Sequence, residues 1–339
     1  MTDLRAQRLA ALGKNYPTAQ LTQALTQTIG IQAQQLRQAE VGLALQVPHL
    51  TRAELLNAYA SGAIVRTWAQ RWTYQLLTAT DWALVIAARI DEPLPTPYFQ
   101  GQQDLFEHLA LSLTQRLAVV EHLTKVEVDT QLDELAQRPL LSQERYTIFQ
   151  LAAHTGAFTF VPKSGNQYEL RAQHPTLLAS SDAIRQLMPR YLAGFGPASL
   201  SDFCKWAGLA IGRVRPLWEK ASQHWIAGEN DNFTLETPTT VPLPEVILTA
   251  GFDAALTGYV DKRWLISAEH ERKLWTVNGI LNPTVILNGT VAGTWHFKVQ
   301  GKRMLVTMTC WTEVSATQQA QITAKLQHVA DFLGLSLVF

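Results

Sequence analysis

The chain has 339 residues with 28 Lys+Arg and 28 Asp+Glu, so its formal net charge is zero. This balance excludes a generally basic nucleic-acid coat, although a local basic patch stays open because the field depends on where charges lie. Hydrophobic residues make up 47% of the chain, which argues against extended disorder, and the length suggests about two domains or three to four small ones. The two cysteines, Cys204 and Cys310, are too few for a disulfide scaffold and fit a reducing cytosol.

No run reaches the roughly 18 apolar residues that a membrane span needs, and the N-terminus lacks the apolar core of a signal peptide. We therefore expect a cytoplasmic protein without a membrane partner. Two proline-rich stretches, 91–98 and 237–244, indicate linkers, because proline continues neither a helix nor a central strand.

Short helices followed by a hairpin form the first predicted unit, residues 1–100. One helix is expected near 18–27. Thr51 and Glu54 have the spacing of a capping box, which predicts a second helix ending near Gly62. Two β-like runs follow at 64–68 and 72–77, joined by a short turn.

The same pattern recurs in the second predicted unit, residues 101–178. It starts with the long amphipathic run 104–125 and continues with a helix over 142–154 that ends at Gly156. A clearer hairpin follows, because 158–162 and 167–171 flank the turn-forming residues 163–166.

In the third predicted unit, residues 179–243, a helix is expected over 181–191. Ser199 and Asp202 give another capping signal with Gly208 as the stop. A further helix over 211–225 and a hairpin within 225–235 complete the unit.

Residues 244–339 differ, because they predict a β-rich module. Asn288 and Gly289 are typical of a type I′ turn between strands 285–287 and 290–298, and a third strand is expected over 303–308. A closing helix is predicted over 316–333. Helices followed by a hairpin are the pattern of a winged helix-turn-helix, so the predicted fold class is α+β: tandem winged helix-turn-helix units with a C-terminal β-rich module. An irregular α+β protein without a nucleic-acid role is the alternative.

Common catalytic motifs are absent from the sequence. Gly194 and Gly196 lack the third glycine of a phosphate loop, and no G-x-S-x-G motif occurs. The nine histidines are scattered and the two cysteines lack a CxxC spacing, so we expect neither a zinc site nor another cofactor.

One short run carries candidate chemistry. Gln32 and Gln34 would share one face of an extended strand, where two carboxamides can bind a water between them. On these residues alone, a solvated surface pair is the alternative.

The wider sequence resembles the AlkZ-type winged-helix DNA glycosylase family, of the Gln-x-Gln type. Its blocks span about residues 30 to 310: Gln32-Ala33-Gln34; Ile64 to Arg71; Tyr191 to Ala198 with Asp202, Trp206 and Gly208; Gly251-Phe252-Asp253 with Gly258, Tyr259 and Arg263; and Gly289 with Gly293-Thr294-Trp295. Two positions depart from the family pattern, because Trp72 replaces a glycine and Gln75 replaces a histidine.

The resemblance implies a monofunctional DNA N-glycosylase with Gln32 and Gln34 as the catalytic pair. A carboxamide takes no proton near neutral pH, so the glutamines would position water and stabilise an oxocarbenium-like state without activating a poor leaving group. We therefore expect cationic purines alkylated at N3 or N7, including crosslinks, as substrates.

The expected partner is double-stranded DNA with alkylated bases, bound by a monomer. Basic residues would neutralise its phosphates. The candidates are Arg66, Arg71, Lys163, Arg171, Arg213, Arg215 and Lys220. The neutral net charge and the two departures also leave open a non-catalytic DNA-binding protein, such as a regulator or lesion sensor, and more remotely an interaction module without a nucleic-acid role.

Overall fold

The computed structural model describes residues 3–14, 18, 20–94, 101–163, 167–237 and 242–339. The tip of the predicted turn 163–166 and parts of both proline-rich stretches therefore lie outside the described residues. Among the described helices, none has the length and apolar character needed to cross a membrane.

In the described part of the chain, four helices precede the first hairpin: α1 (Leu4–Ala11), α2 (Leu21–Thr28), α3 (Leu36–Gln46) and α4 (Arg52–Ser61). The predicted capping box of α4 is confirmed, because the Thr51 hydroxyl accepts from the Glu54 amide and the Glu54 carboxylate accepts from the Thr51 amide. Gly62 ends α4 with a left-handed φ of 78°, as predicted.

The first hairpin consists of β2 (Ile64–Trp68) and β3 (Tyr74–Thr78). The prediction that the second strand starts at Trp72 is wrong. Arg71 and Trp72 have left-handed φ values of 56° and 53° within the 3-10 turn η1 (Gln70–Trp72), so neither can begin a strand.

In the second unit, the long amphipathic run 104–125 is not one element. The structure has α6 (Gln103–Leu117), the short strand β4 (His122–Thr124) and α7 (Lys125–Ala136). Thr124 and Glu127 form a capping box that begins α7, a signal that the amphipathic pattern concealed. The predicted helix α8 (Ser142–His154) and the hairpin of β5 (Phe158–Pro162) and β6 (Tyr168–Ala172) are present.

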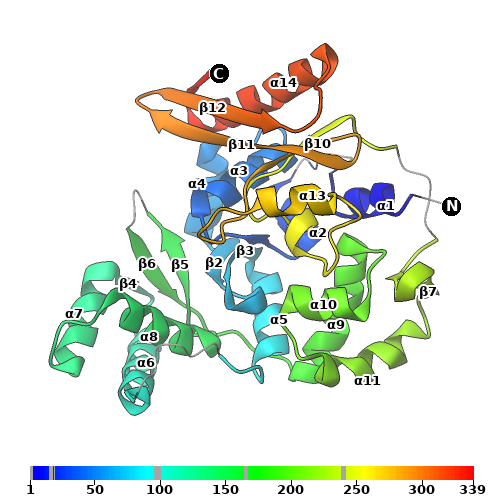
Figure 1. Cartoon of the computed structure of the whole chain (residues 1–339). Helices are drawn as coiled ribbons and strands as arrows, with labels where there is room; N and C mark the ends of the chain where they lie inside the picture. The colour runs from blue at the N-terminus through cyan, green and yellow to red at the C-terminus, as the bar shows by residue number, and fades with distance from the viewer. Residues whose placement is uncertain (1–2, 15–17, 19, 95–100, 164–166, 238–241) are drawn as a thin grey trace.

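The two hairpins and two further short strands form one antiparallel sheet. Its strand order is β1-β3-β2-β5-β6-β4, where β1 is Ile31–Gln32. The hairpins join where Arg66 of β2 pairs with Phe160 of β5. Figure 1 shows this sheet running from the centre of the molecule towards the helices α6, α7 and α8.

Helix α5 (Ala79–Arg89) follows the first hairpin and packs against α9 (Ser180–Phe195). The rest of the third unit consists of α10 (Leu200–Ala207), α11 (Ile211–Ser222), β7 (Ile226–Ala227), η2 (Glu229–Asp231) and β8 (Phe233–Thr234). The predicted cap of α10 is confirmed, because Ser199 and Asp202 form a capping box and Gly208 ends the helix.

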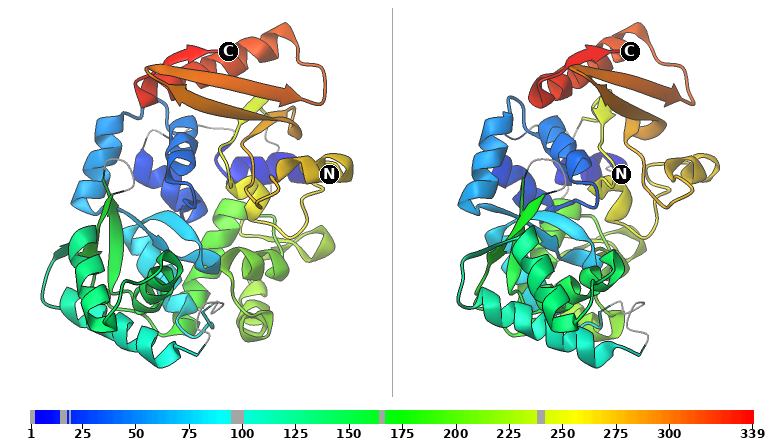
Figure 2. Two further views of the ribbon diagram at one scale, coloured as in Figure 1. Left: turned by 60° about the vertical axis from the view of Figure 1, so that its left-hand side comes forward. Right: turned by 90° about the vertical axis from the view of Figure 1, so that its left-hand side faces the viewer.

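The predicted C-terminal module is a five-stranded sheet of order β13-β12-β11-β10-β9. Its strands are β9 (Val246–Leu248), β10 (Thr284–Leu287), β11 (Thr290–Gln300), β12 (Arg303–Cys310) and β13 (Ser336–Val338). The segment after β9 contains α12 (Ala254–Thr257), α13 (Ala268–Glu271) and η3 (Arg272–Leu274). The closing helix α14 (Ala316–Leu333) packs against α3, so sheet and helix form a layer over the N-terminal helices (Figure 2).

One large cluster of buried hydrophobic side chains extends from Leu9 to Val291 and includes residues of all three predicted helical units. A second cluster lies in the C-terminal sheet around Trp295. The fold class is α+β, as predicted; the unit boundaries and the description of each unit as a winged helix stay predictions.

Candidate functional site

The segment that carries the two glutamines begins with a sharp turn at the end of α2. Ile29 and Gly30 both have positive φ, and a Cβ on Gly30 would lie 2.8 Å from the carbonyl oxygen of Leu76. Only glycine lets the chain approach β3 this closely. The turn therefore directs the following residues into β1, at the edge of the six-stranded sheet.

Gln32 lies directly opposite Gln75 in the register of β1 and β3. The strand ends there, although the Ala33 amide still donates to the Tyr74 carbonyl at 2.6 Å. Gln32 is half-buried, Ala33 is fully buried and Gln34 is exposed in a bend before α3. The extended strand expected to carry both glutamines therefore ends at Gln32. The exposed Gln34 is accessible to a large ligand.

Gln32 is hydrogen-bonded to Arg71, which the sequence predicted to contact DNA. Arg71 Nη2 donates to Gln32 Oε1 at 2.7 Å, and Arg71 Nη1 donates to the carbonyl of Trp206 at the end of α10 at 2.9 Å. Burial lowers the pKa of Arg71 to about 10. The guanidinium thus bridges the first and third predicted units.

The Arg66 side chain binds the backbone of the same segment. Its Nη2 donates to the Ala33 carbonyl at 3.2 Å, and its guanidinium stacks over the Tyr74 ring at 4.2 Å. Paired residues of neighbouring strands lie on the same face of a sheet, and Arg66 pairs with Leu76, which pairs with Ile31. Gln32 follows Ile31 in the strand and points to the other face, so Arg66 and Gln32 lie on opposite faces.

Arg71 packs against the C-terminal end of α10. A Cβ on Gly208, which has φ 70°, would lie 2.7 Å from Arg71 Cα and 2.9 Å from its amide nitrogen. Arg89 also binds here and donates to the carbonyls of Ala207 and Gly208. Two arginines therefore satisfy the last carbonyls of α10, a favourable place for positive charge.

The two departures from the family pattern are both buried beside this network. Trp72 packs against His154, with ring centroids 5.0 Å apart, and Arg89 lies 4.9 Å above the Trp72 ring. Gln75 is 3% exposed, and its Nε2 donates to the Thr73 hydroxyl at 2.8 Å. The replacement of the histidine therefore lies next to Gln32 rather than on the molecular surface.

Three other predicted DNA contacts also have protein partners. Lys163 forms an ion pair with Glu169 at 2.9 Å. Arg171 donates to the carbonyls of Tyr59 and Ala60 at the end of α4. Arg213 pairs with the carboxylates of Asp91 and Glu92 at 2.8 and 2.7 Å.

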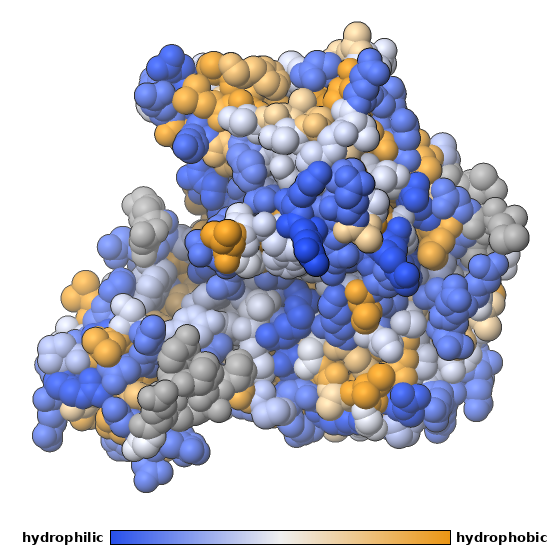
Figure 3. Space-filling model, viewed as in Figure 1, coloured by the Kyte–Doolittle hydropathy of each residue, from blue (hydrophilic) through white to orange (hydrophobic). Residues whose placement is uncertain are grey.

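Arg215 and Lys220, by contrast, are exposed on α11. The predicted DNA contacts stay predictions, and these two exposed side chains are accessible to a phosphate. The face in Figure 3 is largely hydrophilic and is notched between the C-terminal sheet and the body that carries β5 and β6.

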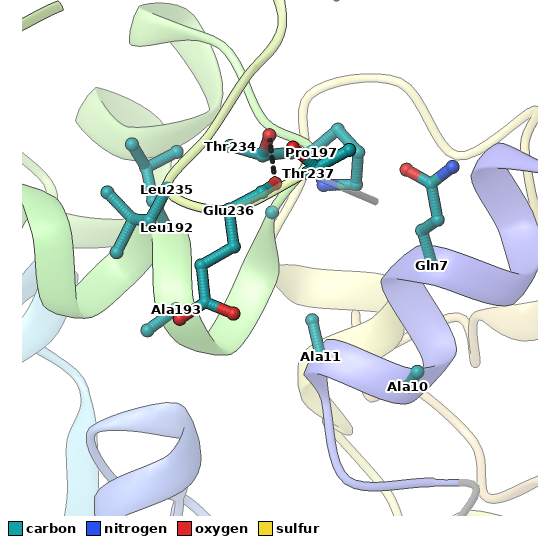
Figure 4. Close-up of a pocket in the computed structure, with 11 residues that line it drawn as sticks. Gln7, Ala10, Ala11, Leu192, Ala193, Pro197, Thr234, Leu235, Glu236 and Thr237 are labelled. Carbon is teal, nitrogen blue, oxygen red and sulfur yellow. Dashed lines mark hydrogen bonds between the residues drawn. The ribbon is translucent and has the colours of Figure 1, made fainter. Parts of the chain in front are cut away.

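A cavity of about 360 Å³ lies elsewhere, between α1, α9 and the residues after β8 (Figure 4). Its lining includes Gln7, Leu192 and Glu236 but neither Gln32 nor Gln34. Within the described ranges, no three His, Cys, Asp or Glu side chains converge as the ligands of a metal ion would.

Three comparisons with known proteins each find similarity to DNA glycosylases. The family model "DNA glycosylase AlkZ-like" matches residues 25–332. An "Interstrand DNA cross-link repair glycosylase" from Streptomyces sahachiroi is 24% identical over 342 residues, covering 91% of this chain and 89% of that protein. The solved structure of the Streptomyces sahachiroi DNA glycosylase AlkZ superposes with a TM-score of 0.82 at 20% identity, covering 99% of this chain and 98% of the other.

Proposed function

The chain belongs to the AlkZ-like DNA glycosylase family, and we propose that it hydrolyses the N-glycosidic bond of cationic alkylated purines in double-stranded DNA. The observation that carries this proposal is the arrangement of Gln32 and Gln34 around the buried Ala33, with Gln32 bound by Arg71. This arrangement presents neutral amides, one of them exposed, at the edge of a sheet.

Glutamine chemistry restricts the mechanism. Neither amide takes a proton near neutral pH, so neither acts as a general base. Their carbonyl oxygens can accept from a water and stabilise positive charge as it develops on the sugar. The water oxygen forms the new bond to C1′, the electron pair of the C1′–N bond leaves with the base, and the water proton passes to solvent.

This mechanism selects the substrate. A purine alkylated at N3 or N7 carries a positive charge, which the departing electron pair neutralises, so the base leaves without protonation. A neutral base would need a general acid, which two carboxamides cannot supply. Cationic alkyl-purines are therefore the substrates that the pair can process, and normal bases are not.

Bulky adducts and interstrand crosslinks fit the same site. The Streptomyces relative is named as a cross-link repair glycosylase, and the exposure of Gln34 supports a site that does not require a small enclosed pocket. The cationic leaving group of an N7-linked crosslink is chemically equivalent to that of N7-methylguanine.

The direct test is base release from duplex DNA that contains N7-methylguanine. The purified full-length chain should release the base well above the spontaneous rate, and it should leave uracil, a neutral base, in place in a matched duplex. Release at only the spontaneous rate from methylated and bulkier adducts, together with a sequence-specific footprint on undamaged DNA, would establish a non-catalytic DNA-binding protein instead.

A further inference from the structure

We propose that Arg71 is a positioning residue that acts on the reaction through Gln32 rather than through a DNA phosphate. This inference rests on the proposed function and deepens it. Sequence reasoning placed Arg71 among the DNA contacts, whereas in the structure both terminal nitrogens of its guanidinium bind protein oxygens, Gln32 Oε1 and the Trp206 carbonyl.

The chemistry of the guanidinium determines how Gln32 is oriented. Arginine has donors and no acceptor, so the group of Gln32 that faces Arg71 must be the carbonyl oxygen and not the amide nitrogen. The 2.7 Å contact fixes this orientation. One lone pair of Gln32 Oε1 then remains for a water, and the Gln32 NH2 group points away from Arg71.

The backbone of Arg71 is closely packed against α10. Arg71 has φ 56°, and a Cβ on Gly208 would lie 2.7 Å from the Arg71 Cα and 2.9 Å from the Arg71 amide nitrogen. Its Nη1 binds Trp206 in the last turn of α10. Helix α10, far along the chain, therefore sets the position of a catalytic side chain on β1.

Arg66 strengthens this arrangement from the other face of the sheet. It binds the Ala33 carbonyl, which lies between the two glutamines in the chain. The segment is thus fixed at the side chain of Gln32 and at the backbone of Ala33. Such preorganisation places water without a reorganisation cost during the reaction.

A double-mutant cycle tests the inference in the full-length protein. Arg71→Lys keeps the charge but lacks the fork that bridges two oxygens, so the single-turnover rate of N7-methylguanine release should fall by about 10- to 100-fold. The Kd for duplex DNA should stay within about twofold. Because Arg71 acts through Gln32, the double variant with Gln32→Ala should be no slower than Gln32→Ala alone.

Arg89→Lys is the matched control, because Arg89 binds the same end of α10 through Ala207 and Gly208. In the described part of the chain Arg89 makes no hydrogen bond to Gln32, so Arg89→Lys should lower the release rate less than Arg71→Lys does. If the effects of Arg71→Lys and Gln32→Ala multiply, or if Arg71→Lys weakens DNA binding and lowers the salt slope by about one unit, the inference is overturned.

A second readout needs no enzymatic activity. In a sample labelled with 15N-glutamine, the Gln32 side-chain NH2 signal is assigned by its loss in Gln32→Ala. Arg71→Lys should shift this signal and raise its mobility, whereas Arg89→Lys should leave it in place. An unchanged Gln32 signal in Arg71→Lys contradicts the inference, whether or not the wild-type protein releases a base. The absence of base release by the wild-type protein would refute only the proposed function.

Discussion

Gln32 and Gln75 lie directly opposite each other on β1 and β3, so a catalytic candidate faces a glutamine at the position where the sequence resemblance led us to expect a histidine. The Gln75 side chain is buried, and its amide donates to the Thr73 hydroxyl just before β3. Gln75 therefore lies beside Gln32 on the same face of the sheet, where it is shielded from solvent.

Gln75→Leu should accordingly retain activity. Leucine keeps the volume of the buried side chain, and the Thr73 hydroxyl stays satisfied because it donates to the Gln70 carbonyl. We expect a loss of about 1 kcal/mol in the free energy of unfolding, the usual net value of one hydrogen bond, and base release within about threefold of wild type. Urea unfolding and single-turnover release check this, and a loss above 100-fold would show that the Gln75 amide takes part in the chemistry.

Gly208→Ala should damage both stability and activity. The substitution places a Cβ against Arg71 and Arg89 in a left-handed backbone, so the free energy of unfolding should fall by more than the roughly 1–2 kcal/mol that the left-handed conformation alone costs. Gly334→Ala is the matched control, because Gly334 also ends a helix at φ 68° but has open space around it. Equal losses of stability and activity in the two variants would show that the close packing of Gly208 against Arg71 does not matter.

Arg215→Ala and Lys220→Ala should weaken duplex binding by a purely electrostatic route. Both residues are exposed on α11, and each phosphate contact contributes about 0.9 to the slope of log K against log salt. We expect each variant to lower that slope by about this amount and to leave the release rate at saturating enzyme unchanged. Arg116→Ala, an exposed arginine on α6, is the control; an identical slope in all three variants would remove Arg215 and Lys220 from the interface.

His154 should make the protein sensitive to acid. Burial lowers the pKa of His154 below 6.5, although a backbone hydrogen bond with Ile90 opposes the shift. The unfolded chain then binds the proton more readily, so stability is complete above about pH 6.5 and falls as the pH drops below it. Between pH 7.5 and 5.5 the melting temperature of wild type should fall more than that of His154→Phe, in which an aromatic ring still packs against Trp72. Equal falls would assign the acid sensitivity to other groups.

Local sequence signals predicted those parts of the fold that local chemistry determines. The caps at Thr51, Ser199 and Gly208 and the Asn288–Gly289 turn each satisfy backbone groups within a few residues, so their residue types reveal them. Helix α7 was missed although Thr124 and Glu127 carry the same capping signal, because the amphipathic pattern ran through residues 118–121 without a proline or glycine.

The site could be predicted only in part. The Gln32–Gln34 spacing is a local feature, but its partner Arg71 lies 39 residues away and α10 lies further still. Basic residues next to a predicted hairpin suggest phosphate contacts, and only tertiary packing shows that Arg66 and Arg71 are bound internally. The sequence therefore drew attention to Arg66 and Arg71 but could not show that both side chains bind oxygens within the protein.

The single-turnover release of N7-methylguanine from duplex DNA by wild type, Gln32→Ala and Gln34→Ala tests the central claim most directly. Each glutamine removed should lower the rate by about 10²- to 10³-fold, the usual effect of losing one group that stabilises a developing charge, while duplex affinity stays within about twofold. Wild-type rates in both variants would contradict the account, because the reaction would then not depend on the amide pair.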